Sequence, residues 1–487
     1  MIGLVVSRAD SASVNIGEAL RSLAEWERRE DPTRSDADGG GTYYRHGDFE
    51  LREFDEWHLE LDCVADAFSE RPEFVAFLSR HAGETGPLLT AHFTGNFGPA
   101  EYGGEPGELS RACPNVQRAV VEAFDRHAPD GYEVGIECTH HGPSDVGAPS
   151  LFVELGSSES EWEDPDGARA VARAVLELSG VAADASESVS GVADGAPAAG
   201  STGRRRQIVG FGAGHYAPQF ERIVRETDWA VGHIGADWVL GSMGAPEANA
   251  DVVDLAFERS AAERALVVGD SPELEAVVED LGYRVVEETY LRVTSGVDLD
   301  LVVSLEDALS PVDDGLRFGT DAETVEATDT VGWTDAVEDG TRSAEGETSD
   351  VEEAYAVVSL PDDLLAEASG IDRDATFEAV EAHALAFETV EGGTKPRGRA
   401  AVVDADARDT IVDAVAAVLE EKYDDVARID GEVAATRETF DPAAAAAAGV
   451  PEGPAFGRLS SGEPVEVDGE EVTPGEVTVE ETVTFQS

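Results

Sequence analysis

The densest group of residues that could do chemistry runs from Glu137 to His141, where a carboxylate, a thiol, a hydroxyl and two adjacent imidazoles follow one another. The chain has only ten histidines, so an adjacent pair is a concentrated use of a scarce residue. One interpretation is a histidine acting as general base with Glu137 orienting it. Another is a zinc site, since neutral imidazole is a common zinc ligand and a catalytic zinc keeps one position for water.

The elements around this group are predicted to bring further polar residues to it. Residues 132–136 alternate like a strand that ends at Glu137, and residues 151–155 form a second apolar run. In open α/β sheets, ligands bind outside the carboxyl ends of strands. We therefore expect one pocket with Glu137, His140 and His141 as catalytic residues. Its expected metal ligands are His92, His140, His141, Glu154 and His215, and its expected substrate contacts are Thr94, Gly95, Asn96, Thr139 and Tyr216.

Each part of this site has a plainer alternative. His92 alone could equally be a structural histidine at a strand end, and neither HExxH nor a paired CxxC spacing supports the metal. The glycines at 210, 212 and 214 resemble a dinucleotide-binding loop, but His215 displaces the third glycine of that motif. A tight strand-to-helix turn explains the same glycines. Thr139 and Ser157-Ser158 are candidate nucleophiles, although no G-x-S-x-G elbow is present.

The order of apolar segments predicts an α/β protein. Strands alternate with helices up to about residue 295, which favours three layers around a central mixed, largely parallel sheet. Within that part we expect a loop at 28–47, a strand at 57–64 and a helix at 73–81. Residues 1–300 are predicted to be the catalytic domain, with a flexible insertion at 181–206. Residues 311–352 then form an acidic linker, and residues 353–487 a small α+β domain.

The charge of the chain points to its solvent. Acidic residues number 102 against 34 basic ones, a formal charge of −68, and only two lysines are present. At about 1 M salt the Debye length is about 3 Å, so like charges scarcely repel. We interpret the surface as an adaptation to a cytoplasm with molar salt. Three irregularly spaced cysteines fit a reducing interior, and neither a signal peptide nor a membrane-spanning run is expected.

Three blocks of the sequence resemble a known family. HFTGN at 92–96, ECTHHGPSDVGAPSLFVELGSSESEW at 137–162 and GAGHYAPQF at 212–220 are similar to signature blocks of the archaeal and plant-type D-aminoacyl-tRNA deacylases. Ala12-Ser-Val-Asn15 fits the same pattern, and the similarity extends over roughly residues 1 to 300. The resemblance implies hydrolysis of the ester between a D-amino acid and the terminal adenosine of tRNA. It also implies zinc and a core related to phosphorylase and peptidyl-tRNA hydrolase folds.

The expected partner is D-aminoacyl-tRNA, with no membrane and no stable protein partner, so that the protein is a monomer. The dense basic stretches are 204–206 and 395–399, and the second is the expected tRNA contact unless it is only a solvated loop. Residues 449–459 resemble a segment of tRNA 3′-processing endonucleases, or are a turn-rich structural segment. Two other functions stay open: a peptidyl-tRNA hydrolase-like or small-molecule amidohydrolase, and a non-catalytic tRNA-end-binding protein.

Overall fold

The computed structural model describes residues 1–185, 205–323, 355–429 and 431–486. Most of the predicted insertion at 181–206 and most of the predicted linker at 311–352 lie outside these residues. The chain divides into two compact units, Met1–Leu299 and Asp300–Ser487, which are described separately below. Within the described ranges, no helix combines the length and the apolar character that crossing a membrane requires.

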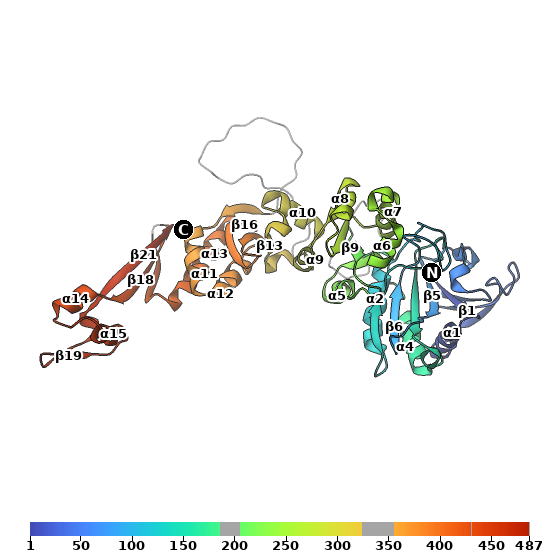
Figure 1. The fold of residues 1–487 in the computed structure, drawn as a ribbon, viewed down its shortest axis with the longest axis horizontal. Coiled ribbons are helices and arrows are strands. Elements are labelled where there is room, and N and C mark those ends of the chain that lie inside the picture. The colour runs from blue at the N-terminus through green and yellow to red at the C-terminus, as the bar shows by residue number, and fades with distance from the viewer. Residues whose placement is uncertain (186–204, 324–354, 430, 487) are drawn as a thin grey trace, which may run out of the picture. The chain divides into compact units, whose positions relative to one another are not determined.

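The first unit contains an eight-stranded mixed sheet in the order β2-β3-β4-β1-β5-β8-β6-β7. Its strands β1, β5 and β6 are labelled in Figure 1. The pairs β1–β4, β1–β5, β5–β8 and β6–β7 are parallel, whereas β6 runs antiparallel to β8. The predicted α/β fold with a large, mostly parallel sheet is confirmed at this level. The strands are β1 (Ile2–Ser7), β2 (Glu27–Asp31), β3 (Gly41–His46), β4 (Phe49–Phe54), β5 (Phe74–Arg80), β6 (Leu88–His92), β7 (Glu133–Ile136) and β8 (Ser150–Gly156).

Helices cover one face of this sheet. The helices α1 (Ser11–Leu23), α2 (Pro114–His127) and α4 (Pro165–Leu176) bury side chains spaced three or four residues apart, such as Ile16 and Leu20 in α1, against the strands. Asp10 caps α1 by accepting from the backbone N–H groups of Ala12 and Ser13. From β8, Leu151, Val153 and Leu155 point to this helical face.

Among the described residues, 3-10 turns and loops rather than a layer of helices pack on the opposite face of the sheet. The 3-10 turns η1 (His58–Glu60) and η2 (Val64–Ala67) and neighbouring loops pack there against Val75 and Phe77 of β5 and Phe152 of β8. The three-layer arrangement expected from the sequence is therefore wrong for this sheet. Short turns leave space between the strands and the covering loops, and Ser79, His92 and Glu154 lie on this side.

A second sheet completes the first unit, where the sequence predicted a single one. It is parallel, with the order β10-β9-β11-β12. Its strands are β9 (Gln207–Gly212), β10 (Ala230–Gly235), β11 (Arg264–Val268) and β12 (Arg284–Val285). The remaining helices of the unit are α3 (Glu159–Trp162), α5 (Pro218–Glu226), α6 (Asp237–Met243), η3 (Pro246–Ala248), α7 (Ala250–Ser260), α8 (Pro272–Asp280) and α9 (Glu288–Val293).

Three local predictions in the first unit are wrong. Residues 73–81, expected as a helix, contain strand β5, which is buried on both faces and so shows none of the alternation that marks a half-exposed strand. The expected loop at 28–47 contains the edge hairpin of β2 and β3, whose charged residues suit a sheet edge. The expected strand at 57–64 is made of the 3-10 turns η1 and η2.

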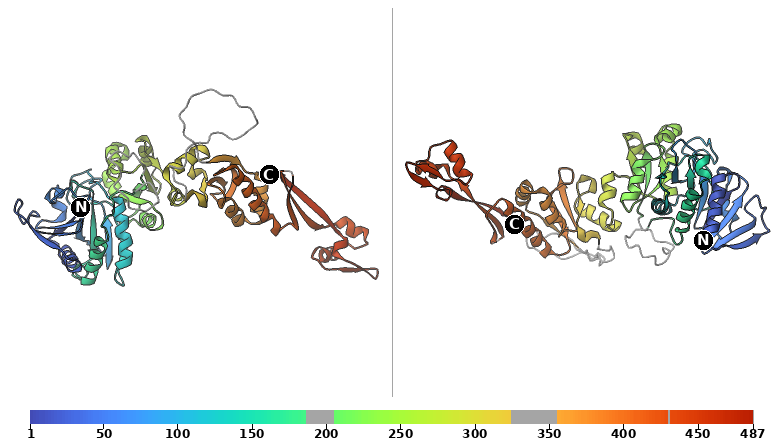
Figure 2. Two further views of the ribbon diagram at one scale, coloured as in Figure 1. Left: turned by 180° about the vertical axis from the view of Figure 1, so that it is seen from behind. Right: turned by 90° about the horizontal axis from the view of Figure 1, so that it is seen from below.

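The second unit contains a four-stranded sheet, β13-β15-β16-β14, and a three-stranded one, β17-β18-β21. Figure 2 shows that the three-stranded ribbon leads to a small tip with α14 and α15. The elements of the second unit are α10 (Leu299–Ala308), η4 (Val312–Asp314), β13 (Arg317–Phe318), η5 (Thr320–Glu323), β14 (Ala356–Ser359), α11 (Asp362–Ile371), α12 (Arg373–Glu381), β15 (Ala386–Val390), β16 (Lys395–Val402), α13 (Ala405–Val418), η7 (Leu419–Glu421), β17 (Asp425–Ile429), β18 (Glu432–Phe440), α14 (Pro442–Ala447), α15 (Pro454–Ser460), β19 (Val465–Val467), β20 (Glu470–Val472), η8 (Pro474–Glu476) and β21 (Thr478–Gln486).

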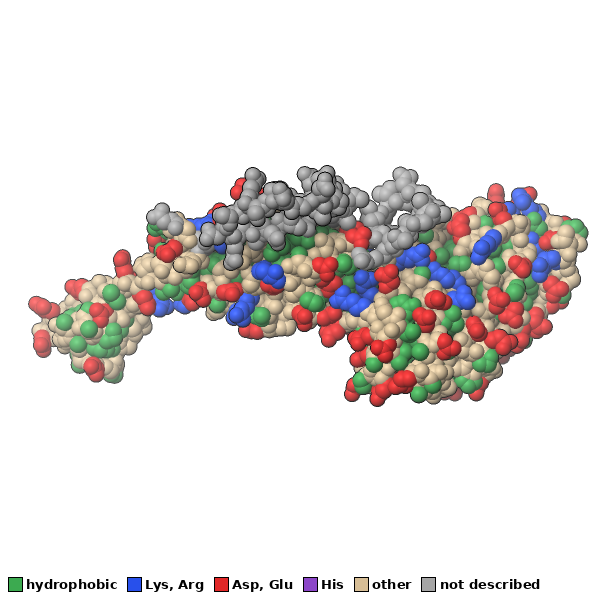
Figure 3. Space-filling model, turned by 90° about the horizontal axis from the view of Figure 1, so that it is seen from above, with side chains coloured by type: hydrophobic (Ala, Val, Ile, Leu, Met, Phe, Trp, Pro, Cys, Tyr) green, Lys and Arg blue, Asp and Glu red, His purple; other side chains and the backbone are tan. Residues whose placement is uncertain are grey.

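In this unit the structure differs from the sequence in where the acidic linker begins and in the surroundings of the basic stretch at 395–399. The predicted linker began at 311, but β13 pairs with β15 and so belongs to the folded sheet. On β16, Arg399 pairs with Glu388 at 2.6 Å, Lys395 lies 3.6 Å from Glu391 and Arg397 lies 3.8 Å from Asp362. Each cation of the expected tRNA contact thus has an acidic neighbour. Figure 3 shows acidic side chains spread widely over the visible surface.

Candidate active site

Three histidines meet on the open face of the large sheet. His92 ends β6, and His140 and His141 lie in the loop after β7. Their ring centroids are 4.5 to 4.7 Å apart, and one ring nitrogen from each lies within 4.8 Å of the other two. Each Nδ1 is hydrogen-bonded to a backbone carbonyl: His92 to Phe93 at 3.0 Å, His140 to Cys138 at 2.8 Å and His141 to Gly142 at 2.8 Å.

Because these hydrogen bonds engage Nδ1, Nε2 is the ring nitrogen of each histidine that is left to bind a ligand. A carbonyl can only accept, so each Nδ1 carries the proton and each Nε2 of a neutral ring offers a lone pair. Burial and the neighbouring imidazoles lower the pKa of His140 well below its usual value, and burial with His92 lowers that of His141 to about 4. The Nε2 of His92 is buried without a hydrogen-bond partner. The cluster therefore fits a transition-metal ion such as zinc, with three nitrogen ligands.

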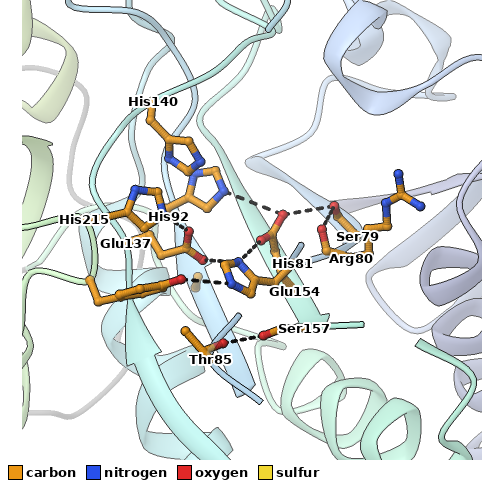
Figure 4. Close-up of polar contacts among 12 residues, drawn as sticks. Ser79, Arg80, His81, Thr85, His92, Glu137, His140, Glu154, Ser157 and His215 are labelled. Carbon is orange, nitrogen blue, oxygen red and sulfur yellow. Dashed lines mark hydrogen bonds and ion pairs between the residues drawn. The ribbon is translucent and has the colours of Figure 1, made fainter. Parts of the chain in front are cut away.

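A second cluster, His81, Glu137 and Glu154, lies beside His92 and His140 of the first (Figure 4). The Nδ1 of His81 lies 3.1 Å from Glu137 and 3.7 Å from Glu154. Burial alone would lower the pKa of His81, but the two carboxylates raise it to about 10. Burial opposes ionisation of Glu154, yet His81 and His92 lower its pKa to about 2. His81 is thus an imidazolium between two carboxylates.

Glu137 also holds a residue from the second sheet. His215, in the turn after β9, places its Nε2 2.7 Å from the other Glu137 oxygen (Figure 4). The His215 and His140 ring centroids are 4.6 Å apart, which confirms the prediction that distant segments complete one pocket. Tyr216 brings its hydroxyl within 3.3 Å of the His81 Nε2. Glu137 therefore orients the imidazoles of both His81 and His215.

The two sheets are joined at this point by backbone contacts. The N–H of Cys138 donates to the carbonyl of His215 at 2.8 Å, and the N–H of Thr139 donates to Ile234 of β10 at 2.9 Å. Gly212 adopts φ +89°, and a Cβ there would lie 2.1 Å from the carbonyl oxygen of Val268. Only glycine fits that turn, and the turn delivers His215. Gly212 thus has the structural use that was the alternative to a nucleotide loop.

His140 and His141 of the first cluster and all three residues of the second line a cavity of about 670 Å³. On the wall next to Glu154, the Ser79 hydroxyl donates to its Oε1 at 3.0 Å, and that Oε1 lies 3.7 Å from the His92 Nε2. Asp10 lines another wall, where burial raises its pKa to about 6. Carboxylates, imidazoles and aromatic rings together suit a polar ligand. The lining residues are Asp10, Trp57, His58, Leu59, Glu60, Ser79, Arg80, His81, Ala82, Tyr102, Glu137, His140, His141, Phe152, Glu154, His215 and Trp238.

The expected substrate contacts separate into two groups. Asn96 lines a smaller cavity of about 170 Å³ that shares His140 with the large one, and Tyr216 contacts His81. Thr94, Gly95 and Thr139 line neither of these cavities. The Thr94 hydroxyl bonds to Ser110, Gly95 donates its N–H to the His141 carbonyl at 2.7 Å, and Thr139 bonds to His233 at 3.0 Å. These three hold the loops that carry the histidines.

Sequence reasoning missed His81, which follows β5 immediately. Residues 73–81 are predicted to be a helix, so the sequence does not mark His81 as the end of a strand. The available signal was the same one that found His92: a polar residue directly after a buried apolar run. Asp10, His58 and Ser79 were missed as well. They are single polar residues without a neighbouring motif.

Comparison with known proteins fits this geometry. A family profile described as D-aminoacyl-tRNA deacylase matches residues 68–286. A protein of Halorubrum lacusprofundi named D-aminoacyl-tRNA deacylase is 53% identical, over 100% of this chain and 96% of that one. The chain belongs to the D-aminoacyl-tRNA deacylase family. The resemblance seen in the sequence blocks is thereby confirmed.

Other members of this family show how far the similarity reaches. The Natronomonas pharaonis protein of that name is 51% identical over 98% of both chains, and the Methanosphaerula palustris one is 31% identical over 97% of this chain and 95% of its own. A solved conserved protein of unknown function is 27% identical, covering 60% of this chain and 96% of that one, with a TM-score of 0.49. The profile region contains the three histidines, His81, both buried glutamates and His215.

Proposed function

We propose that the protein hydrolyses the ester bond of D-aminoacyl-tRNA, releasing the D-amino acid and tRNA, with zinc held by His92, His140 and His141. The observation that carries the proposal is the cluster of His92, His140 and His141 beside a cavity large enough for an aminoacyl group. One ring nitrogen of each lies within 4.8 Å of the other two, and each Nδ1 is held by a carbonyl. Family membership over the full chain supports the substrate.

The chain supplies the ligands and their orientation. The carbonyls of Phe93, Cys138 and Gly142 keep the three rings in the tautomer that binds a cation through Nε2. Bound zinc would activate a water molecule at neutral pH and polarise the ester carbonyl. Since metal ligands must be deprotonated, acid should weaken metal binding at this cluster.

The buried carboxylates handle protons in this proposal. Glu154 places Oε1 nearest the His92 Nε2, at 3.7 Å, and its depressed pKa keeps it ionised. It accepts a proton from the attacking water as the new carbon–oxygen bond forms. The ester carbon–oxygen bond then breaks, and the proton passes to the leaving ribose oxygen. His81 balances the charge of both glutamates, and Glu137 holds His215 in place.

The test compares two substrates that differ only in the chirality of one carbon. Purified protein in molar KCl should deacylate D-tyrosyl-tRNA at least tenfold faster than L-tyrosyl-tRNA. Treatment with a chelator should abolish turnover, and added zinc should restore it. Equal rates on the two substrates would exclude a D-specific deacylase. Full activity after the metal has been removed, checked by elemental analysis, would exclude the zinc part of the proposal.

The remaining expectations from the sequence stay predictions. A monomer that works in a cytoplasm with molar salt, without a stable protein partner, is checked by light scattering during size-exclusion chromatography at 1 and 3 M KCl. A dimer mass would contradict it. The expected likeness to phosphorylase and peptidyl-tRNA hydrolase folds likewise remains a prediction.

A further inference from the structure

The most exposed aromatic side chains of the described residues gather at one place. Tyr102 is 61% exposed, Trp238 48% and Tyr216 37%, whereas the other aromatic side chains in the described ranges are buried or half-buried. Tyr102 and Trp238 line the large cavity, and Tyr216 contacts His81 and His215. Exposed apolar side chains that cluster beside a cavity mark a binding surface.

Two of these rings lie where two cavities meet. Tyr102, His140 and Trp238 line both the cavity of about 670 Å³ and the smaller one of about 170 Å³. Trp238 also stacks toward His215, with ring centroids 6.3 Å apart and planes inclined by 29°. A ligand that extends from the large cavity into the smaller one would therefore contact these rings.

We propose that Trp238, Tyr102 and the smaller cavity form the subsite for the terminal nucleobase of the tRNA. This inference rests on the proposed function, in which the reacting ester joins the amino acid to the ribose of the terminal adenosine. The base is then one sugar away from the reacting carbonyl, and the chain presents exposed aromatic rings beside the same cavity. Nucleobases stack on aromatic side chains through a π-face that every base has.

Asn96 supplies the polar side of this subsite. Its amide nitrogen donates to the carbonyls of Gly103 at 3.0 Å and Glu105 at 3.3 Å, and the residue lines the smaller cavity. Both donors of the amide point to the loop, so the amide oxygen is the atom left for a ligand. An amide oxygen accepts a hydrogen bond from an exocyclic amine such as that of adenine.

The charge of the chain favours stacking over ion pairing for holding the tRNA end. With a formal charge of −68, the protein repels a polyanion at low salt, and molar salt removes the gain from the phosphate contacts it could make. The cations of the basic stretch on β16 already have acidic neighbours. Base stacking does not depend on opposite charge, so it survives where phosphate recognition fails.

The kinetic test uses Trp238→Ala, Tyr102→Ala and the conservative Trp238→Phe. Loss of one stack should raise the KM for D-tyrosyl-tRNA by about 5- to 150-fold, the range measured for base–aromatic stacks, with a smaller change in kcat. Trp238→Phe should restore most of the affinity. Val479→Ala, at an exposed apolar side chain of the second unit, is the matched control and should leave KM unchanged. KM within twofold of wild type in both alanine variants would overturn the proposal.

A binding measurement separates this inference from the proposed function. The trinucleotide CpCpA is titrated into the protein in molar KCl and followed by calorimetry, which needs no turnover. Weaker binding in both Trp238→Ala and Tyr102→Ala supports the subsite, even if no deacylation is detected. Unchanged binding, or no binding to wild type, overturns it, even if D-tyrosyl-tRNA is hydrolysed. Tyr102 lies in an exposed loop, so its variant keeps the test decisive should Trp238→Ala unfold.

Discussion

His81 lies between the carboxylates of Glu137 and Glu154, and only 5% of its side chain is exposed. Replacing it in His81→Gln removes the positive charge and leaves two buried carboxylates facing each other. Removing one partner of a buried ion pair typically costs about 3–5 kcal/mol. We therefore predict a loss of that size in the free energy of unfolding, measured by guanidinium denaturation in molar KCl, together with a large loss of kcat.

A matched control exists on the surface. His127 contacts Glu177 at 2.5 Å, but Glu177 is 40% exposed, and pairs of this kind contribute about 0–1 kcal/mol. His127→Gln should therefore leave stability and kcat nearly unchanged. If His81→Gln were no more destabilising than His127→Gln, the interpretation of His81 as the charge between two carboxylates would be wrong.

His233 makes the stability of the first unit dependent on pH. Its ring lies between the Thr139 hydroxyl at 3.0 Å and the Ser110 carbonyl at 2.8 Å, and burial lowers its pKa from 6.5 to about 4. Between pH 6.5 and 4 the unfolded chain binds a proton that the folded one does not. Stability from this group is therefore complete above pH 6.5 and is lost as the pH falls toward 4.

His233→Gln should remove that dependence. From pH 7 to 4.5 the free energy of unfolding of wild type should fall by about 2–3 kcal/mol more than that of His233→Gln, because glutamine does not titrate. Denaturant titrations at both pH values measure the difference. Parallel pH profiles for the two proteins would show that His233 is not a buried neutral ring.

At the scale of elements, the turn after β9 is predicted to hold the composite site together. Gly212→Ala places a Cβ 2.1 Å from the Val268 carbonyl in a left-handed conformation, which by itself costs about 1–2 kcal/mol. The variant should be less stable by at least that much and should lose activity as His215 moves. Gly214→Ala, where no atom lies within 4 Å of the added Cβ, should be close to wild type. Equal effects would contradict this account of the turn.

The sequence predicts the elements whose apolar pattern is complete within one segment. The strands on either side of the double histidine, expected at 132–136 and 151–155, lie close to those positions in the structure. Strand β5 was not, because a strand buried on both faces has no alternation and its aromatic spacing resembles a helix. That single error also hid His81.

The sequence identifies site residues where a histidine ends a strand. It is less informative where a contact depends on which strands pair with one another. That β6 runs antiparallel to β8, and that β9 belongs to a separate sheet, cannot be deduced from the pattern of one segment. Both facts decide which side chains meet. Thr94 and Thr139 stand among conspicuous site residues, yet their hydroxyls bond inward to Ser110 and His233. Only the three-dimensional packing distinguishes such supporting residues from contacts.

At the scale of the whole molecule, the charge of −68 predicts a fold that depends on salt. Lowering KCl from 3 to 0.1 M lengthens the Debye length to about 10 Å, so the acidic surface repels itself. The melting temperature, followed by circular dichroism, should fall steeply over this range. Sucrose at matched osmolality should not replace the salt if screening is the cause. A melting temperature independent of KCl would contradict the halophilic interpretation.

We propose that the three-histidine cluster holds the metal on which deacylation by this chain depends. The most direct measurement is deacylation of D-tyrosyl-tRNA in molar KCl by wild type and His140→Ala, with zinc determined in the same samples. The account predicts about one zinc per wild-type chain with turnover, and loss of both in a folded His140→Ala protein. Wild-type turnover and zinc content retained in His140→Ala would contradict it.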